Sequence, residues 1–512
     1  MARELGYRLD FVLNAAWRPW RLGGSIFRVG NTQLPQYLGL PVLVFFCAVC
    51  VCAQKQPPTR ASQHYEKGVG LLKTQQLDEA IAEFREAIRL NPNFAEAHSQ
   101  LGFALGVKGL LQDSISEFEI AIKLKPNFGD AQYYLGAARW FSNDVDGAIV
   151  ALKAAVKLMP NHANAHYHLG LALHKRGDLQ PAIAALRSAA RLAPAMAEAF
   201  HALGLALVKA EDFDGAIEAF QTAIKLKPAS ARAHNDLGLA LVQKRDPDGA
   251  IAAFNSALKL DPNDLVAHYN LGMVLIQKGD YSSAVELYRR FIALAPDNAE
   301  AHYNLGLALK QKDQLDEAVL QLKKAIAIQP SLPEAHYILG LIFMQQSKLS
   351  DAVAALRVAT EAKPNYAEAH YALGTVLQQQ GNLDGAIASF RIALKHAPNA
   401  PEIHNTLGTT LSRKGDKEAA RIEFQEAARL NKLKSNAQAG MFATNTGIAL
   451  LKEGKVEAAI ERLQAAVELD PTNAQAYYNL ATALQRTGQR SAARSAYQKA
   501  KELDPRVKPL PP

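Results

Sequence analysis

Histidine is the residue type whose number and spacing most suggest chemistry in this sequence. Nine of the fourteen histidines stand 34 residues, or twice that number, apart, and imidazole is the commonest metal ligand in proteins. A zinc ion needs its ligands to converge at about 2.0–2.1 Å, whereas equivalent residues of neighbouring packed helices stand roughly 10 Å apart. We therefore interpret these histidines as packing residues and predict no metal site. They are His64, His98, His166, His234, His268, His302, His336, His370 and His404.

No other constellation in the sequence suggests catalysis. All three cysteines fall in one apolar stretch, at Cys47, Cys50 and Cys52, so the rest of the chain can form no disulfide and no thiolate metal site. No glycine-rich phosphate loop follows a strand pattern. We expect no enzymatic activity, no catalytic residue and no cofactor.

The net charge is concentrated near the N-terminus. Residues 1–60 hold seven Lys and Arg against two acidic residues, so they contribute +5 of the total of +8 and leave +3 for the other 452 residues. Binding to nucleic acid normally needs a clustered basic face. We therefore expect no nucleic-acid partner.

Residues 38–53 form an apolar segment of sixteen residues that carries no charge and follows several arginines. About 20 residues are needed to span a bilayer, whereas roughly 7–15 make a signal-peptide core. We predict that residues 1–53 are a basic leader, either a signal peptide cleaved after Ala53 or an uncleaved membrane anchor. Both alternatives predict an exported or membrane-tethered protein, and a leader without function would leave it in the cytoplasm.

A period of 34 residues runs through the rest of the chain. Prolines recur at this interval from Pro58 to Pro398, and again at Pro471 and Pro505. We number each repeat so that its proline is position 32. Glycine then stands at position 8, and alanine at positions 20 and 27, in twelve of thirteen repeats, while position 24 is always Phe, Leu or Tyr. Small residues let antiparallel helices cross at about 8–10 Å, large residues fill the remaining gaps, and proline ends the second helix.

This pattern resembles the tetratricopeptide repeat (TPR), and the resemblance covers residues 59–505. It implies an all-α fold, a right-handed α-solenoid of about thirteen TPR helical hairpins, and binding of other proteins or peptide segments. We expect repeats 1–11 in residues 54–431, an irregular insertion at 432–443, repeats 12 and 13 in 444–505, and a Pro-rich tail at 506–512.

Three irregularities predict local departures from this array. Phe291 replaces the alanine of position 27 in repeat seven, and overfilling a helix crossing predicts a wider spacing there. Lys432 replaces the expected proline, and extra residues follow that lengthen a helix or add a loop and divide eleven repeats from the last two. The tail contains no capping helix, so the C-terminal face is predicted to meet a partner or a second copy of the chain.

In the family that this sequence resembles, the first helix of each hairpin lines the concave surface. The resemblance therefore implies a groove whose walls carry tyrosine at position 5, asparagine at position 6 and glutamine at position 13. Carboxamides can pair with any peptide backbone, and tyrosine suits binding surfaces; the alternative is that the tyrosines pack between repeats and the glutamines are solvated. The candidates are Tyr133, Tyr167, Tyr269, Tyr303, Tyr337, Tyr371, Asn270, Asn304, Gln243, Gln277, Gln311, Gln345 and Gln379.

Repeat three carries an unusual group of aromatic residues. Arg139 stands where leucine is expected at position 11, and Trp140 and Phe141 follow it beside Tyr133 and Tyr167. An exposed aromatic cluster is a candidate hot spot for binding. The alternative is that Trp140 fills the space that leucine would occupy.

These observations predict a non-catalytic scaffold that binds extended polypeptide segments along its concave face. One alternative is a structural assembly subunit that self-associates through its C-terminal end. The other is the specificity arm of a separately encoded enzyme such as a glycosyltransferase, because the asparagines partly resemble the ladder of the O-linked N-acetylglucosamine transferase, whose catalytic domain has no counterpart in this sequence.

Overall fold

The computed structural model describes residues 59–510, and the predicted leader at 1–53 lies outside the described residues. Every regular element in the described range is an α-helix, which confirms the all-α solenoid of helical hairpins. None of these helices combines the length and apolarity needed to cross a bilayer. The chain divides into two compact units, Met1–Ala295 and Pro296–Pro512, which are described in turn.

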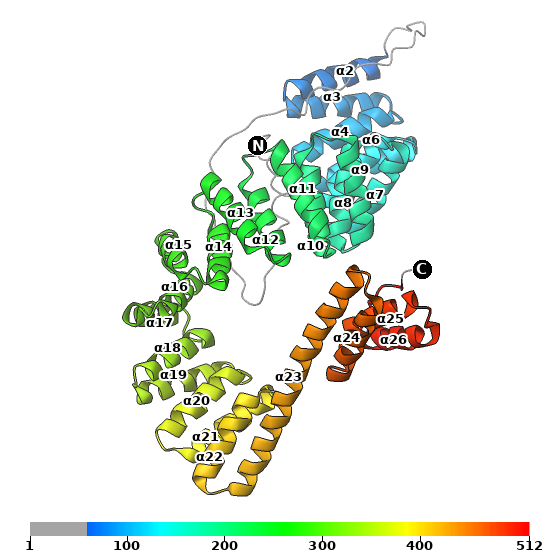
Figure 1. Ribbon diagram of the computed structural model, residues 1–512. Helices are drawn as coiled ribbons and strands as arrows, with labels where there is room; N and C mark the ends of the chain where they lie inside the picture. The colour runs from blue at the N-terminus through cyan, green and yellow to red at the C-terminus, as the bar shows by residue number, and fades with distance from the viewer. Residues whose placement is uncertain (1–58, 511–512) are drawn as a thin grey trace. The chain divides into compact units, whose positions relative to one another are not determined.

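The first unit contains the seven hairpins of repeats one to seven (Figure 1). Its helices are α2(Arg60–Lys73), α3(Leu77–Leu90), α4(Ala95–Val107), α5(Leu111–Leu124), α6(Gly129–Phe141), α7(Val145–Leu158), α8(Ala163–Arg176), α9(Leu179–Leu192), α10(Ala197–Lys209), α11(Phe213–Leu226), α12(Ala231–Gln243), α13(Pro247–Leu260), α14(Leu265–Lys278) and α15(Tyr281–Leu294).

The two helices of a hairpin cross where the glycine of position 8 meets the large side chain of position 24. In repeat five, a Cβ atom added to Gly204 would lie 2.6 Å from Cε1 of Phe220, which is closer than van der Waals contact allows. Phe220 is completely buried. Because glycine has no side chain, α10 and α11 can approach closely and bury this ring between them.

The turn between the two helices of a hairpin is fixed by backbone and side-chain hydrogen bonds. Gly177 ends α8 with a φ of +100°, a left-handed conformation that favours glycine, and its N–H donates to the carbonyl of Leu173 at 3.0 Å. At the start of α11, the Asp212 side chain accepts from the N–H of Gly215 at 3.1 Å. Such N-caps satisfy donors that would otherwise lack a partner.

Successive first helices of the hairpins approach one another more closely than successive second helices do, as α10 and α12 show. A stack of hairpins curves toward the side on which its helices lie closer together. The first helices therefore line the concave side of each unit, which agrees with the expectation drawn from the family resemblance.

Repeat seven departs from its neighbours. Helices α14 and α15 pack less closely than the two helices of any other hairpin, and this confirms the predicted wider spacing. Tyr288 and Phe291 are both buried in this hairpin, with their ring centroids 6.5 Å apart. Two large rings occupy the crossing that alanine and one large side chain occupy elsewhere. The division between the compact units falls after this repeat, at residue 295. The predicted division between repeats eleven and twelve stays a prediction.

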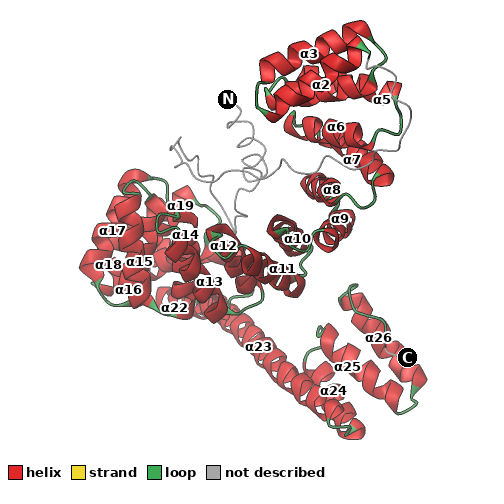
Figure 2. Ribbon diagram, turned by 90° about the horizontal axis from the view of Figure 1, so that it is seen from above, coloured by secondary structure: helices red, strands yellow, loops and turns green. Residues whose placement is uncertain are grey.

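The second unit contains repeats eight to thirteen, and one helix of 36 residues runs through two of them (Figure 2). Its helices are α16(Ala299–Gln311), α17(Leu315–Ile328), α18(Pro333–Gln345), α19(Leu349–Ala362), α20(Ala367–Gln379), α21(Leu383–His396), α22(Pro401–Lys414), α23(Lys417–Lys452), α24(Val456–Leu469), α25(Ala474–Arg486) and α26(Arg490–Leu503).

The predicted insertion at 432–443 lies entirely inside α23, so of the two alternatives the extra residues lengthen a helix. The first part of α23 is the second helix of repeat eleven, and its last part is the first helix of repeat twelve. Lys432 allows this continuity because, unlike proline, it donates a backbone N–H and does not clash with the preceding turn.

The C-terminal face is partly covered. Residues 504–510, the described part of the tail, form no helix, and Leu510 packs against the core cluster of the last hairpin, as Tyr497 does. Arg490 and Arg494 occupy positions that are apolar in almost every other repeat, and both are exposed. The outer face of the last hairpin is therefore polar at these two positions. Self-association through this end stays a prediction.

Candidate functional site

Polar contacts connect neighbouring first helices on the concave side. In four of them the side chain at position 5 of one repeat meets the side chain at position 6 of the next, and we call such a pair a rung. In the first unit, the Tyr133 hydroxyl lies 3.3 Å from His168 Nδ1. The others are His201 Nε2 with Asp236 Oδ2 at 2.8 Å and Asn270 Nδ2 with Asn235 Oδ1 at 3.0 Å in the first unit, and the Tyr371 hydroxyl with Thr406 Oγ1 at 3.2 Å in the second.

The two asparagines of the predicted site are held within the protein. Asn270 already donates to Asn235, and Asn304 is 4% exposed, so neither amide is freely presented to a ligand. A buried carboxamide with a protein partner stabilises the stacking of repeats. A ligand-binding role for these asparagines stays a prediction.

Two of the candidate tyrosines at position 5 pack against an aromatic ring at position 34 of their own repeat. The ring of Tyr133 lies 4.9 Å from that of His162, and the ring of Tyr337 lies 5.1 Å from that of Tyr366. Tyr167 is only 6% exposed and belongs to the core. The packing alternative therefore describes Tyr167, whereas the other five candidate tyrosines at position 5 are half-buried. These are Tyr133, Tyr269, Tyr303, Tyr337 and Tyr371.

The expectation of an exposed tryptophan in repeat three is wrong. Trp140 is 5% exposed and lies in the core of the first unit, while Lys175 Nζ stands 5.0 Å above its ring and Phe141 is half-buried. Arg139, whose side chain is 24% exposed, pairs with Glu119 at 2.7 Å. The indole thus fills the volume left by the missing leucine, as the alternative foresaw.

The position-13 glutamines are exposed in all five repeats. Gln345 is held by its neighbour, since its Nε2 donates to Oδ1 of Asp313 at 2.9 Å. The exposure agrees with the solvated alternative and also leaves carboxamides accessible along the rim of the concave side. They are Gln243, Gln277, Gln311, Gln345 and Gln379.

The residues at position 9 were not among the candidates predicted from the sequence. In several successive repeats they form a line of partly exposed apolar side chains, which we call the apolar line. This position is one helical turn beyond the rungs and one turn before position 13, so it shares their face of the first helix. Leu205 and Leu239 are half-exposed there, and Met273 is 42% exposed. Sequence alone could have suggested it, because apolar residues recur at a position that the resemblance assigns to the groove.

The position-4 histidines make the packing contacts predicted for them. His98 Nδ1 lies 2.6 Å from a carboxylate oxygen of Glu117, and its Nε2 lies 3.1 Å from the carbonyl oxygen of Pro92. The hydrogen bond to Glu117 raises the pKa of His98. Within residues 59–510 no group of histidine, cysteine and acidic side chains is arranged to hold a metal ion.

His174 provides a pH-sensitive element in the core of the first unit. It is 7% exposed, and burial, reinforced by the charge of Lys209, lowers its pKa to about 4. The imidazole of an unfolded chain has a pKa of about 6.5, so below that pH the unfolded state binds the additional proton.

We expect the free energy of unfolding of the first unit to fall as the pH drops from about 6.5 toward 4, with the His174 contribution reduced by about 2 kcal/mol at pH 5. His174→Leu should lose this part of the pH dependence and leave stability at pH 7.5 nearly unchanged. Urea unfolding followed by circular dichroism at both pH values measures it. Parallel pH profiles for the two proteins would contradict the assignment.

Comparison with known proteins agrees with this architecture. Models described as tetratricopeptide repeat or TPR repeat match residues 71–109, 142–177, 163–196, 201–264, 241–290, 269–333, 340–381, 371–434, 447–488 and 474–507. No curated protein matches the chain.

Several solved structures are similar to parts or most of the chain. YrrB, described as a TPR protein with an unusual peptide-binding site, is 26% identical, with 36% of this chain and 95% of YrrB covered and a TM-score of 0.34. MamA is 31% identical, with 32% and 95% covered and a TM-score of 0.30. A structure of Naa15/Naa10 bound to HypK-THB is 12% identical, with 88% and 94% covered and a TM-score of 0.34.

Proposed function

Since this chain belongs to the tetratricopeptide repeat family, we propose that it is a scaffold whose concave side binds extended polypeptide segments. The observation that carries the proposal is the accessible apolar line at position 9, bordered by exposed carboxamides at position 13. Within the first unit, Leu239 and Gln243 are followed one repeat later by Met273 and Gln277. Apolar side chains that a folded protein leaves accessible on a concave surface favour a binding role.

The spacing of the repeats restricts the shape of the ligand. Neighbouring packed helices stand about 8–10 Å apart, and an extended or polyproline-type chain advances about 3.1–3.3 Å per residue. One repeat therefore corresponds to about three ligand residues. A polyproline-type segment with an apolar side chain at every third residue would place each one over a position-9 side chain.

The carboxamides at position 13 would fix the ligand backbone. Each amide donates and accepts, so it can pair with a backbone C=O or N–H whatever the ligand side chain is. Each contact is weak, and affinity comes from repetition along the groove. The ligand class is thus defined by spacing and apolarity rather than by charge.

We expect the full chain to bind a fluorescein-labelled peptide with leucine at every third residue more tightly than a scrambled peptide of the same composition. Leu239→Glu together with Met273→Glu should weaken this binding at least tenfold, because each carboxylate would be desolvated by the ligand. Fluorescence anisotropy titration measures both affinities.

Leu260→Glu is the matched control, because Leu260 is 44% exposed on the second helix of its hairpin, away from the concave side. It should leave the affinity unchanged. Equal binding of regular and scrambled peptides, or equal loss in the control variant, would contradict the proposal. Circular dichroism checks that all variants retain their helices.

The predicted leader also indicates where in the cell the protein would bind its ligands. An exported or tethered scaffold would meet its ligands outside the cytoplasm. N-terminal sequencing of the mature chain distinguishes the alternatives, since cleavage gives Gln54 as the first residue and an anchor leaves the leader in place.

A further inference from the structure

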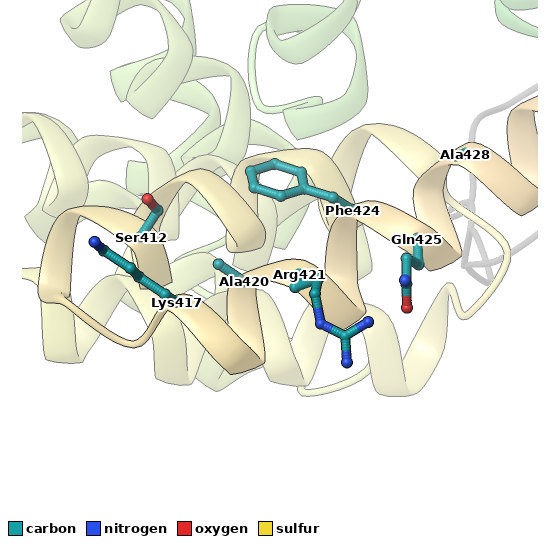
Figure 3. Close-up of a pocket in the computed structure, with 7 residues that line it drawn as sticks. All are labelled: Ser412, Lys417, Ala420, Arg421, Phe424, Gln425 and Ala428. Carbon is teal, nitrogen blue, oxygen red and sulfur yellow. The ribbon is translucent and has the colours of Figure 1, made fainter.

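Repeat eleven leaves uncovered a side chain that other repeats bury. The position-24 side chain is at most 2% exposed in eleven of the other twelve repeats, whereas Phe424 is 40% exposed. Its ring lies over Gly408 of α22, where an added Cβ would be 2.9 Å from Cε1. Figure 3 shows the ring at an open pocket that is also lined by Lys417, Arg421 and Ala428.

Repeat twelve leaves the complementary side chain uncovered. The position-3 residue, which faces the preceding repeat, is at most 5% exposed in eleven repeats. Phe442 holds this position in repeat twelve and is 75% exposed. The contact that is missing is the kind that Ile403 makes in repeat eleven, where it packs in one cluster with Phe390.

The continuous helix is the reason for both exposures. Phe424 and Phe442 are 18 residues apart on α23, which is five helical turns or about 27 Å. Within one chain the straight helix therefore holds repeat twelve away from repeat eleven. Figures 1 and 2 show α23 as one uninterrupted helix, and its residues 431–435 and 437–439 are exposed.

A seam of exposed residues joins the two phenylalanines along one face of α23. Its members follow one another at intervals of four and three residues, which keeps them on one side of a helix, and none carries a charge. Gly440, Thr444 and Gly447, which α23 buries against its neighbours, lie on the opposite side of the helix. The seam consists of Phe424, Ala428, Asn431, Ser435, Gln438 and Phe442.

We propose that a second copy of this chain docks on the seam, with the two α23 helices antiparallel about a twofold axis near residue 433. The seam is self-complementary in this arrangement, because residues equidistant from 433 face each other. Phe442 of one copy then covers Phe424 of the other, and Arg421 faces Asn445. Each copy supplies the position-3 side chain that the other copy's repeat eleven lacks, in an isologous interface.

The residues in the middle of the seam suit a close crossing. Ala428, Asn431 and Ser435 are small, so the two backbones can approach, and Asn431 of each copy faces Ser435 of the other within hydrogen-bonding reach. A helix pair of about five turns buries less than the roughly 1,600 Å² of a standard interface, so we expect a reversible dimer with a micromolar Kd. This surface is distinct from the C-terminal face considered above.

The test is sedimentation of the full chain over a range of concentrations up to about 100 µM. The wild-type chain should show a concentration-dependent increase from monomer to dimer mass, and Phe424→Ser with Phe442→Ser should stay monomeric. Leu433→Ser is the matched control. Leu433 is 53% exposed on the same helix but nine residues from each phenylalanine, which places it on the opposite side.

Disulfide crosslinking tests whether the two α23 helices are antiparallel. It does not depend on substitutions that weaken the dimer. In a full chain with Cys47, Cys50 and Cys52 replaced by serine, we introduce single cysteines. A mixture of Asn431→Cys and Ser435→Cys chains should form a disulfide-linked heterodimer at least tenfold faster than Leu433→Cys chains link to one another.

Three results would overturn the proposal. The first is a monomer at every concentration. The second is a dimer that the two phenylalanine substitutions leave intact, which would place the contact elsewhere, for example at the C-terminal face. The third is crosslinking through Leu433→Cys as fast as through the seam. None of these bears on peptide binding in the first unit, so the two proposals can fail separately.

Discussion

Gly204→Leu should disrupt the hairpin of repeat five. Even a Cβ at this position would lie 2.6 Å from the buried ring of Phe220, and leucine adds three further carbons to the same crossing. Overfilling a core by one or two carbons costs about 1–3 kcal/mol, so we expect a loss of at least about 3 kcal/mol here. Hydrogen exchange measured by mass spectrometry should show lost protection in α10 and α11.

Because the repeats form a linear array, the loss of protection should spread only a short way along it. Each repeat contacts only its neighbours, so the loss should be largest in repeat five and fade within one or two repeats on either side. A uniform loss of protection across the first unit would contradict this account.

Gly70→Leu is the matched control for this substitution. Gly70 also lies in a first helix, but an added Cβ would meet nothing within 4 Å. This substitution should not destabilise the chain, and the higher helix propensity of leucine should add up to about 1 kcal/mol of stability. Gly204→Leu combined with Phe220→Ala should recover part of the loss, because removing the ring vacates the volume that leucine enters. Equal damage from both glycine substitutions would show that the crossing is not what requires glycine.

Lys432→Pro should break α23 and free repeats twelve and thirteen from the rest of the second unit. Proline removes one backbone hydrogen bond and clashes with the preceding turn, at a cost of about 3 kcal/mol in a helix interior. Little tertiary packing opposes the break, because Leu433 and Lys434 are exposed. Small-angle scattering should detect the change as a broader distribution of interatomic distances.

Limited trypsin digestion provides a second readout. Cleavage after Lys434 should become fast in Lys432→Pro and stay slow in Lys432→Ala, which loses the same charge and keeps the backbone N–H. The proline variant should also lose the dimer proposed above, since the seam needs a straight helix. Unchanged scattering and unchanged cleavage would show that the junction is not held straight by helix continuity.

Much of this architecture could be predicted from the sequence, because each hairpin is specified locally. Gly204 and Phe220 are 16 residues apart and meet inside one hairpin, and the same pair recurs at a fixed interval. Such short-range contacts need no knowledge of distant parts of the chain. The wider spacing of repeat seven followed in the same way from Phe291 alone.

The candidate site could be predicted only in part. The resemblance indicated which helix face lines the groove, and the exposed glutamines such as Gln277 lie where it implied. Whether a side chain on that face is free depends on the next repeat, however. Asn270 is bound by Asn235, and Trp140 turned inward because the adjacent leucine position holds Arg139, which pairs with Glu119.

The sequence by itself determined the period, the helix class and the small-residue crossings, since these depend on residue types at fixed local separations. Only the tertiary structure decided that the residues around Lys432 continue a helix instead of forming a loop, and hence that Phe424 and Phe442 are left uncovered. A missing proline and a few added residues are compatible with either outcome locally. What separates the two outcomes is the packing of whole repeats, which no short stretch of sequence contains.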